Sequence, residues 1–384
     1  MKRWIVYRAN IPNEQRVIDN IKKLVPEVFV LDRKCKNNDM DPELAQDLFE
    51  LIHTKKTEMI FSVDYYPIIA EVAHTAGIRY ISWIVDSPHY TLYSTSSFYD
   101  ECFIFHFDRE EARLLKETGR PHIFHQPLAS DPEYFQGVIQ AKRGIQWNGI
   151  SFLGSAYQDD QDYFEKNGLD EYDRGYCEGL MQIQSVLYGV SLIEAALSDG
   201  LADRLIKACN IRWPETYDLP PNLVAANVLE KKITVRERSQ VVNELAKHYG
   251  ITLYSESDAL VRDNVNYRGY ADYETEMPIA FHYSRININP TLRKIHSGIP
   301  LRAMDIMACG GFLLSNYQPE LAEFFEDGIS CAMYGSIEEL VDKSGWYLEH
   351  EEERAKIALR GYEIVCDRFT YEKALQKIIR IVGE

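Results

Sequence analysis

Hydrophobic positions in the first third of the chain gather into short apolar runs that are separated by longer amphipathic stretches. The apolar runs predict strands at residues 4–7, 27–31, 59–63, 80–85, 103–107 and 122–124. The stretches between them predict helices at residues 13–24, 42–53, 67–76 and 109–118. Strands that alternate with helices of about a dozen residues are typical of a parallel, doubly wound sheet. We therefore expect a Rossmann-like domain over residues 1–140, followed by a polar linker at 141–148.

The alternation starts again at residues 149–154 and is then interrupted. Residues 160–230 are helical in pattern, with apolar side chains at mixed helical spacings: Ile183, Leu187, Val190, Leu192, Ala195 and Ala196. We interpret this stretch as a helical insertion whose apolar side chains pack internally, with a lid or a dimer surface as the alternative.

Beyond the insertion the strand and helix patterns alternate again. Helices are predicted at 235–249, 276–283, 300–310, 319–325 and 351–369, and strands at 251–254, 266–269, 286–289 and 312–316. The second domain is thus expected over residues 149–370. Residues 371–384 predict an amphipathic helix that can cross back to the first domain. The expected fold is α/β, with two doubly wound domains that face a cleft.

Composition narrows the class of protein. A chain of 384 residues exceeds one ordinary core, in agreement with two domains. The net charge of −17 argues against nucleic acid and anionic membrane surfaces as main partners. Seven cysteines without a Cys-x-x-Cys pair favour a reducing compartment. No apolar run approaches the length of a membrane span or of a signal peptide's apolar region, so we expect a soluble, cytoplasmic protein.

Residues 287–316 carry the most specific chemistry. The pattern is a strand, a loop with Ser297 and Gly298, a helix that ends at Gly310, and a second strand. The free N–H groups and the positive dipole end of that helix favour an anion such as a diphosphate. The expected cradle consists of Ser297, Gly298, Ile299, Pro300 and Leu301, with side-chain cations from Arg293, Lys294 and Arg302. A nucleoside diphosphate is the expected ligand.

Asp305 lies eight residues after Ser297, about two helical turns, so both can face the same side of the helix. A carboxylate beside a nucleotide loop commonly accepts hydrogen bonds from ribose hydroxyls. The alternative is an ordinary pair between Arg302 and Asp305 on the helix surface.

A run of motifs resembles the CgeB (spore maturation protein) group of GT-B glycosyltransferases. The motifs are Tyr267-Arg-Gly-Tyr270, Ser284-Arg-Ile-Asn-Ile-Asn289, Thr291-Leu-Arg293, Ser297-Gly-Ile-Pro-Leu-Arg302, Asp305-Ile-Met and Gly310-Gly-Phe-Leu-Leu-Ser-Asn316. Phe61-Ser-Val-Asp-Tyr-Tyr-Pro67 and Tyr80-Ile-Ser-Trp-Ile-Val-Asp-Ser-Pro88 resemble the group's amino-terminal domain.

The resemblance implies a GT-B enzyme of hexosyltransferase type. The second domain would bind a nucleotide-sugar donor, with a UDP-sugar expected, and the first a protein, peptide or glycan acceptor. Gly154 and Ser155 fall at the turn that approaches the phosphates, and Tyr267, Arg268 and Gly269 fall where the base is held. Asp305 falls at the second glutamate of the retaining GT-B pattern. The first glutamate falls on Ser297, which has no carboxylate, and this leaves the stereochemistry open.

The first domain offers candidates for the chemistry on the acceptor side. Asp86 follows an apolar strand, so it is expected at the carboxyl edge of the sheet, where it can take a proton from an acceptor hydroxyl. The alternative is a turn-forming role before Ser87-Pro88. His89, His106 and His125 also lie near strand ends, as acceptor contacts or as structural histidines.

Arg302 is the expected catalytic cation, and no metal or other cofactor is required if cations neutralise the leaving diphosphate. The acidic run Asp159-Asp-Gln-Asp162 contains an Asp-x-Asp and is interpreted as a solvated loop rather than a metal site. Two rival functions stay open: a nucleotide-sugar epimerase, and a non-catalytic nucleotide-binding protein that acts through the helical insertion. Whether the chain forms a homodimer is open for all three functions. If the cationic cradle is correct, Arg302→Ala or Arg293→Ala should abolish most turnover with little loss of folding.

Overall fold

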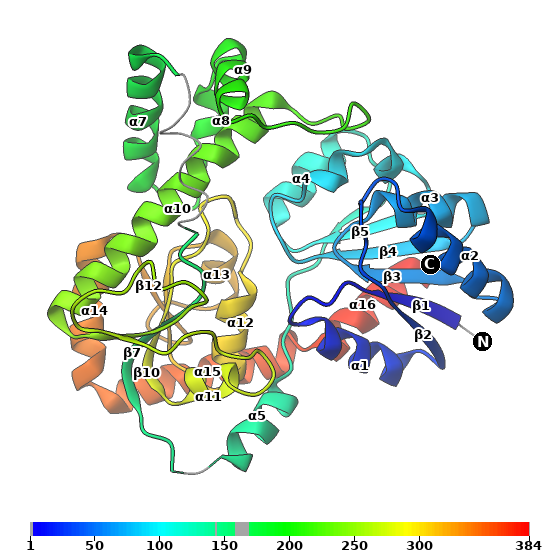
Figure 1. Cartoon of the computed structure of the whole chain (residues 1–384). Helices are drawn as coiled ribbons and strands as arrows, with labels where there is room; N and C mark the ends of the chain where they lie inside the picture. The colour runs from blue at the N-terminus through cyan, green and yellow to red at the C-terminus, as the bar shows by residue number, and fades with distance from the viewer. Residues whose placement is uncertain (1–2, 143, 158–168, 384) are drawn as a thin grey trace. The chain divides into compact units, whose positions relative to one another are not determined.

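The computed structural model describes residues 3–142, 144–157 and 169–383 and divides the chain into two compact units (Figure 1). Unit 1 consists of Met1–Ala129, Trp213–Leu219 and Phe369–Glu384. Unit 2 consists of Ser130–Arg212 and Pro220–Arg368.

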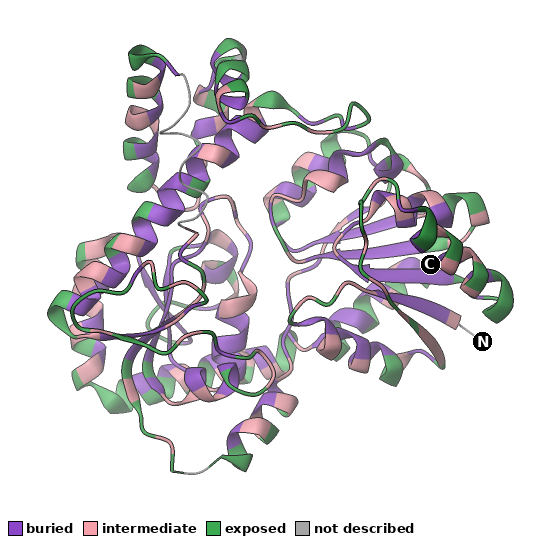
Figure 2. Ribbon diagram, viewed as in Figure 1, coloured by how far each residue is buried: buried purple, intermediate pink, exposed green. Residues whose placement is uncertain are grey.

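Unit 1 is built on a six-stranded parallel sheet with the order β2-β1-β3-β4-β5-β6. Its strands are β1 (Arg3–Arg8), β2 (Glu27–Asp32), β3 (Met59–Val63), β4 (Arg79–Ile84), β5 (Cys102–His106) and β6 (Ile123–His125). All residues of β3 and β5 are buried, as the continuous apolar runs predict for strands covered on both faces (Figure 2). The order reverses between β1 and β3, so the carboxyl ends of these strands form a switch point of the kind where doubly wound sheets bind ligands.

Helices cover both faces of this sheet. They are α1 (Glu14–Leu24), α2 (Pro42–Lys55), α3 (Pro67–Ala76), α4 (Arg109–Glu117) and α16 (Tyr371–Gly383), with 3₁₀ turns η1 (Tyr90–Tyr93) and η2 (Thr95–Phe98). Local sequence fixes the helix ends: Asp41 accepts a hydrogen bond from the Leu44 N–H, and Lys56 ends α2 in the left-handed conformation.

Two distant segments complete unit 1. Helix α16 packs beside α1, and Tyr371 meets the buried Trp83 ring edge-on at 6.0 Å. Residues 213–219 also join this unit, because Asp218 N–H donates to the Tyr93 carbonyl at 2.8 Å and Tyr217 bridges to Ser94.

Unit 2 has a second six-stranded parallel sheet, with the order β12-β11-β10-β7-β8-β9. Its strands are β7 (Asn148–Leu153), β8 (Ile251–Tyr254), β9 (Val265–Tyr267), β10 (Ser284–Asn289), β11 (Leu313–Asn316) and β12 (Ala332–Tyr334). The chain runs outward from β7 to β9, then returns to place β10 on the other side of β7. The switch point therefore lies at the carboxyl ends of β7 and β10.

Helices also cover both faces of the second sheet. They are α5 (Pro132–Ala141), α7 (Glu171–Ser185), α8 (Ile193–Ala196), α9 (Asp199–Ala208), α10 (Pro221–His248), α11 (Met277–His282), α12 (Leu301–Ala308), α13 (Pro319–Phe324), α14 (Ile337–Glu349) and α15 (Glu351–Arg368). Helices α10 and α14 pack together, while α5, α11, α12 and α15 form a second group. None of the described helices combines the length and the apolar character that a membrane crossing requires.

The structure differs from the sequence expectation in several elements. A single helix, α10, covers the end of the expected insertion and the separate helix expected from residue 235. Helix α5, strand β12 and helix α14 were not predicted. Helix α5 lies in unit 2 rather than at the end of the first domain, because Ser130 bonds to Asp305 and Phe135 packs on Tyr273.

The helical insertion also differs in its surface. Ile183, Val190 and Leu192 are 56%, 55% and 44% exposed, so the expectation that they pack internally is wrong for these three side chains. Their mixed helical spacing follows from a break in the helix, since α7 ends at Ser185 before Val190 and Leu192.

Candidate functional site

The turn after β7 meets the side chain of Arg302 at the switch point of unit 2. Gly154 follows the last residue of β7, and Arg302 lies in the first turn of α12. A Cβ atom placed on Gly154 would lie 2.5 Å from Nη2 of Arg302 and 3.0 Å from its Cζ. Arg302 Nη1 donates to Oδ1 of Asn289, the last residue of β10, at 3.1 Å. The absence of a side chain at residue 154 therefore makes room for the guanidinium between the two strand ends.

A second arginine, Arg238 of α10, lies beside the first. Its Nη1 donates to the Ser155 carbonyl at 2.6 Å and its Nη2 to the Pro290 carbonyl at 3.2 Å. Its Nε is buried and has no acceptor among the described residues. Both guanidinium groups lie over the Phe152 ring, at 5.6 Å for Arg238 and 5.3 Å for Arg302.

The charges of this pair are poorly compensated. Neither arginine forms an ion pair within the described parts of the chain. Burial, followed by the neighbouring Arg238 charge, lowers the pKa of Arg302 to about 9. Burial likewise lowers the pKa of Arg238. Arg238 is buried and Arg302 is half-buried, and two adjacent cations with so little solvent are costly in isolation and favour the binding of an anion.

The start of α12 adds a third contribution. Pro300 is its N-cap residue, and no side chain caps the helix. Gly298 and Ile299 are buried, and Leu301 begins the helix half-buried. The amino end of α12 carries the partial positive charge of its uncapped N–H groups next to Arg302. Residues 298–301 thus lie between the end of β10 and the start of α12, at the carboxyl edge of the second sheet.

Two of the expected cradle residues face other partners. Ser297 donates through Oγ to Oε1 of Glu320 at 2.8 Å, and its carbonyl accepts from the Glu320 N–H at 3.1 Å. Lys294 lies near Glu230, whose pKa is raised by burial and lowered in part by the Lys294 charge.

Arg293 is a structural residue, which corrects the expectation that it offers its charge to a diphosphate. Its Nε donates to Oε2 of Glu237 at 2.7 Å, and both side chains are almost fully buried. Its Nη1 and Nη2 donate to the carbonyls of Leu187 at 2.7 Å and Ser185 at 2.8 Å. Burial opposes its charge, but the Glu237 carboxylate outweighs that effect and raises the pKa of Arg293. The guanidinium therefore joins the loop after α7 to α10, and its charge is paired with the Glu237 carboxylate.

Asp305 is buried within unit 2. Its Oδ1 accepts from the Ser130 hydroxyl at 2.6 Å and its Oδ2 from the Tyr273 hydroxyl at 3.0 Å. Burial raises its pKa to about 7, although both hydroxyls and the Arg302 charge lower it in part. In this structure two protein hydroxyls occupy the positions that the sequence assigned to ribose hydroxyls. The alternative of a solvated helix-surface pair is wrong, because the Asp305 carboxylate is not exposed.

Residues expected to hold a base line the edge of the same sheet. Tyr267 ends β9, and its hydroxyl donates to the Ser255 carbonyl at 2.9 Å. Arg268 is exposed, and its side chain has no partner among the residues described here. Gly269 has φ +75° and accepts a hydrogen bond from the Ser255 N–H at 2.9 Å. The three residues lie at the carboxyl end of β9, on the same edge as Gly154 and Ser155.

Two carboxylates lie at the carboxyl edge of the sheet in unit 1. Asp86 follows β4, is exposed, and accepts from the Ser87 N–H at 2.9 Å, as a turn-forming aspartate does. Asp64 follows β3 and accepts from the Val85 N–H at 3.0 Å. Burial raises the pKa of Asp64, with the His89 charge opposing it and Asp86 adding to it. His89 Nδ1 lies 4.0 Å from Oδ1 of Asp64.

The other two histidine candidates lie at the same edge of this sheet. His106 and His125 are paired in register at the ends of β5 and β6. Burial lowers the pKa of His106 to about 4, so its ring is neutral near pH 7 and accepts from the Asp108 N–H. The four sequence-predicted residues Asp86, His89, His106 and His125 therefore lie at one sheet edge.

Two residues of these sites were missed in the sequence. Asp64 had a usable signal, because it follows an apolar strand in the same way as Asp86. Arg238 had none, because it stands in the middle of a 28-residue helix. The acidic run Asp159-Asp-Gln-Asp162 lies outside the described residues.

A family model matches part of the chain. Residues 236–380 match a family model described as "Glycosyl transferase-like". No curated protein matches the chain in sequence.

Solved structures match over the whole chain. HepE from Anabaena, solved with UDP and glucose, is 12% identical, with a TM-score of 0.55 and 100% of both chains covered. The sucrose-phosphate synthase of Thermosynechococcus elongatus is 8% identical, with a TM-score of 0.59 over 100% of this chain and 99% of that one. A glycosyltransferase from Rickettsia africae is 10% identical, with a TM-score of 0.52 over 99% of this chain and 97% of that one. The fold of this chain is GT-B, with two Rossmann-like units.

Proposed function

We propose that this protein is a glycosyltransferase that moves a sugar from a nucleoside diphosphate sugar to an acceptor. Three findings support the proposal: the GT-B fold, the family match over residues 236–380, and a cationic site at the switch point of unit 2. The proposed donor site is formed by Gly154, Ser155, Arg238 and Arg302 together with the amino end of α12.

The observation that carries the proposal is the adjacent pair of guanidinium groups, with Arg238 buried and Arg302 half-buried, that has no ion-pair partner in the described chain. A diphosphate supplies the negative charge that Arg238 and Arg302 lack, and the unpartnered Nε of Arg238 gives one more donor. Arginine is well suited to this role, because its planar fork binds phosphate oxygens bidentately.

The proposed reaction transfers a glycosyl group. The bond between the anomeric carbon and the β-phosphate oxygen breaks, and its electron pair leaves with the nucleoside diphosphate. An acceptor oxygen bonds to the anomeric carbon and loses its proton, for which Asp86 in unit 1 is the proposed base. Arg302 and the amides at the start of α12 stabilise the charge that develops on the departing diphosphate.

The donor and acceptor classes belong to the same proposal. HepE from Anabaena was solved in complex with UDP-glucose, with a TM-score of 0.56 and 11% identity over 99% of both chains, which makes a UDP-hexose the first donor to test. We propose that the enzyme is CgeB-like and that its acceptor is a protein, a peptide or a glycan. We also propose that Arg238 and Arg302 neutralise the leaving group without a metal ion, and that Tyr267, Arg268 and Gly269 hold the base.

The test is a mass analysis of nucleotide sugars after incubation with the full chain. A transferase releases a nucleoside diphosphate, either by transfer to an added acceptor or by slow hydrolysis of the donor. An epimerase would instead yield an isomer of the donor without an acceptor. If neither change occurs with UDP-, GDP- and dTDP-sugars, and none of the donors raises the melting temperature, the proposal fails.

A further inference from the structure

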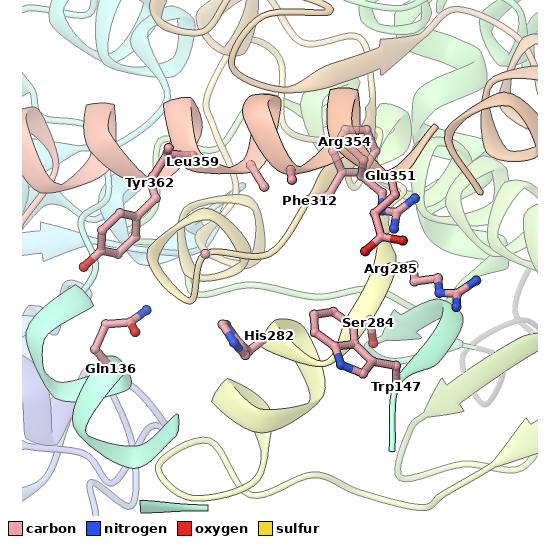
Figure 3. A pocket seen from close by; sticks show the side chains of 13 residues that line it. Gln136, Trp147, His282, Ser284, Arg285, Phe312, Glu351, Arg354, Leu359 and Tyr362 are labelled. Carbon is pink, nitrogen blue, oxygen red and sulfur yellow. The ribbon is translucent and has the colours of Figure 1, made fainter. Parts of the chain in front are cut away.

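A separate pocket lies at the opposite edge of the sheet in unit 2. It has a volume of about 420 Å³ and opens where β7, β10 and β11 begin, whereas the cationic pair lies where β7 and β10 end. Helices α5 and α15 supply its other walls (Figure 3). A pocket of this size is typical of small-molecule sites, and it shares no lining residue with the proposed donor site.

One wall of the pocket is aromatic and unusually open. Trp147 is 53% exposed, and its ring is supported from one side by His282 at 6.1 Å and Tyr283 at 5.4 Å between centroids. The buried ring of Phe312 and the apolar side chain of Leu359 on α15 complete an apolar lining. An exposed tryptophan with a fixed ring plane offers a surface on which a flat ligand can stack.

Charged groups gather at the same end of the pocket as Trp147, as Figure 3 shows for Arg285, Glu351 and Arg354. Arg285 is exposed and, among the residues that the structure describes, has neither an ion pair nor a side-chain hydrogen bond. Arg354 is buried and donates to the Tyr347 carbonyl. With Glu351 as the one acidic side chain of the lining, the pocket has an excess of one positive charge in a chain of net charge −17.

The two arginines influence each other. Burial lowers the pKa of Arg354, with the Glu351 carboxylate opposing this effect and the Arg285 charge reinforcing it. An anion placed between the two arginines relieves that repulsion. Trp147 and Phe312 exclude water from the apolar end of the pocket.

We propose that this pocket binds a small organic anion with a flat aromatic body, of which an aromatic carboxylate is the simplest kind. The carboxylate would lie between Arg285 and Arg354, and the ring would stack on the exposed face of Trp147.

Calorimetric titration of the full chain with 1-naphthoate tests the proposal. We expect saturable binding at one site per chain. Trp147→Ala and Arg285→Gln should each weaken that binding at least ten-fold, because they remove the stacking surface and one of the two cations. Both side chains are exposed, so the melting temperatures of these variants should match that of the wild type.

Control variants outside the pocket and two control ligands test whether 1-naphthoate binds in this pocket. Trp346→Ala removes a tryptophan of similar exposure, 46%, and Arg360→Gln removes an exposed arginine of α15 that pairs with Glu363; neither lines the pocket, and both should leave binding unchanged. The uncharged 1-naphthalenemethanol and inorganic phosphate should each bind at least ten-fold more weakly than 1-naphthoate. The proposal is wrong if the wild type shows no saturable binding of 1-naphthoate. It is also wrong if Trp147→Ala and Arg285→Gln bind 1-naphthoate as tightly as the wild type, or if either control probe binds the wild type as tightly as 1-naphthoate.

Discussion

Arg238 and Arg302 place their guanidinium groups over one ring, that of Phe152, although they come from different helices. The ring provides a weakly attractive surface for both cations but no negative charge. The anion that completes this arrangement has to come from a ligand, and the switch point of a doubly wound sheet is where such a ligand binds.

Arg293 should be important for stability rather than for donor binding. Arg293→Ala leaves the Glu237 carboxylate buried without its partner and removes the donors for the Leu187 and Ser185 carbonyls. Breaking a buried pair in this way costs about 3–5 kcal/mol of unfolding free energy. Urea denaturation measures it.

A double variant tests whether the lost stability comes from leaving the buried Glu237 carboxylate without its ion-pair partner. Arg293→Met combined with Glu237→Leu removes both buried charges, and it should recover much of the stability that Arg293→Ala loses. If Arg293→Ala unfolds at the wild-type urea concentration, the structural role of this ion pair is wrong.

Gly154→Ala should weaken donor use, because its Cβ would lie 2.5 Å from Nη2 of Arg302 and displace the guanidinium. We expect kcat/KM for the nucleotide sugar to fall about ten-fold or more, as expected for a misplaced charged donor. Gly149→Ala is the control for a methyl group added nearby, since Gly149 lies in β7, the strand that Gly154 follows, and a Cβ there meets no atom within 4 Å. Equal kcat/KM values for the two variants would mean that Arg302 does not need its present position.

Asp305 should make stability depend on pH with a defined sign. Burial raises its folded pKa to about 7. An unfolded aspartate has a pKa of about 3.9, so between these values the folded chain holds a proton that the unfolded chain releases. The contribution of this carboxyl to stability is therefore complete below about pH 4 and is lost as pH rises through about 7.

Asp305→Asn removes this titration. Its unfolding free energy, relative to that of the wild type, should rise by about 3 kcal/mol between pH 5 and pH 8. Urea denaturation at four pH values measures the difference. The same comparison for Asp100→Asn, an exposed aspartate, should be flat. A flat difference for Asp305→Asn as well would show that its carboxyl is ionised at pH 5.

Asp86→Asn should lower kcat about 100-fold or more with little change in the melting temperature, as the loss of a general base does. Asparagine keeps the side-chain oxygen that accepts from the Ser87 N–H, so the turn persists. Asp100→Asn serves as the control in the same unit. A wild-type kcat for Asp86→Asn would leave Asp86 as a turn-forming residue only.

The sequence predicted the parts of the fold that local pattern determines. Buried strands such as β3 and β5 are continuous apolar runs, and their order along the chain was enough to predict doubly wound sheets. Helix α10 runs without a break through residues 230–235, where the sequence prediction ends the insertion and begins a separate helix, and no glycine or proline interrupts it after Pro221. Helix α5 joins unit 2 through contacts more than a hundred residues away, such as Ser130 with Asp305, which no local pattern contains.

For the candidate site, too, local sequence pattern indicates only the residues at strand and helix ends. Gly154 and Arg302 stand at strand and helix ends, and their positions in the sequence already indicate the sheet edge. Arg293 has the same local appearance as Arg302, but its partner Glu237 is 56 residues away and changes its role. Arg238 is an ordinary helix residue in the sequence, and only the crossing of α10 over the end of β7 brings it to the site.

Calorimetric titration of UDP tests the central claim most directly, in the wild type, in Arg302→Gln and in Arg360→Gln as a control for the loss of one exposed arginine. The wild type and Arg360→Gln should bind UDP at one site with equal affinity, and Arg302→Gln should bind at least ten-fold more weakly, with an unchanged melting temperature. Equal affinity in Arg302→Gln, or no binding of UDP, GDP or dTDP by the wild type, would contradict a diphosphate site at the ends of β7 and β10.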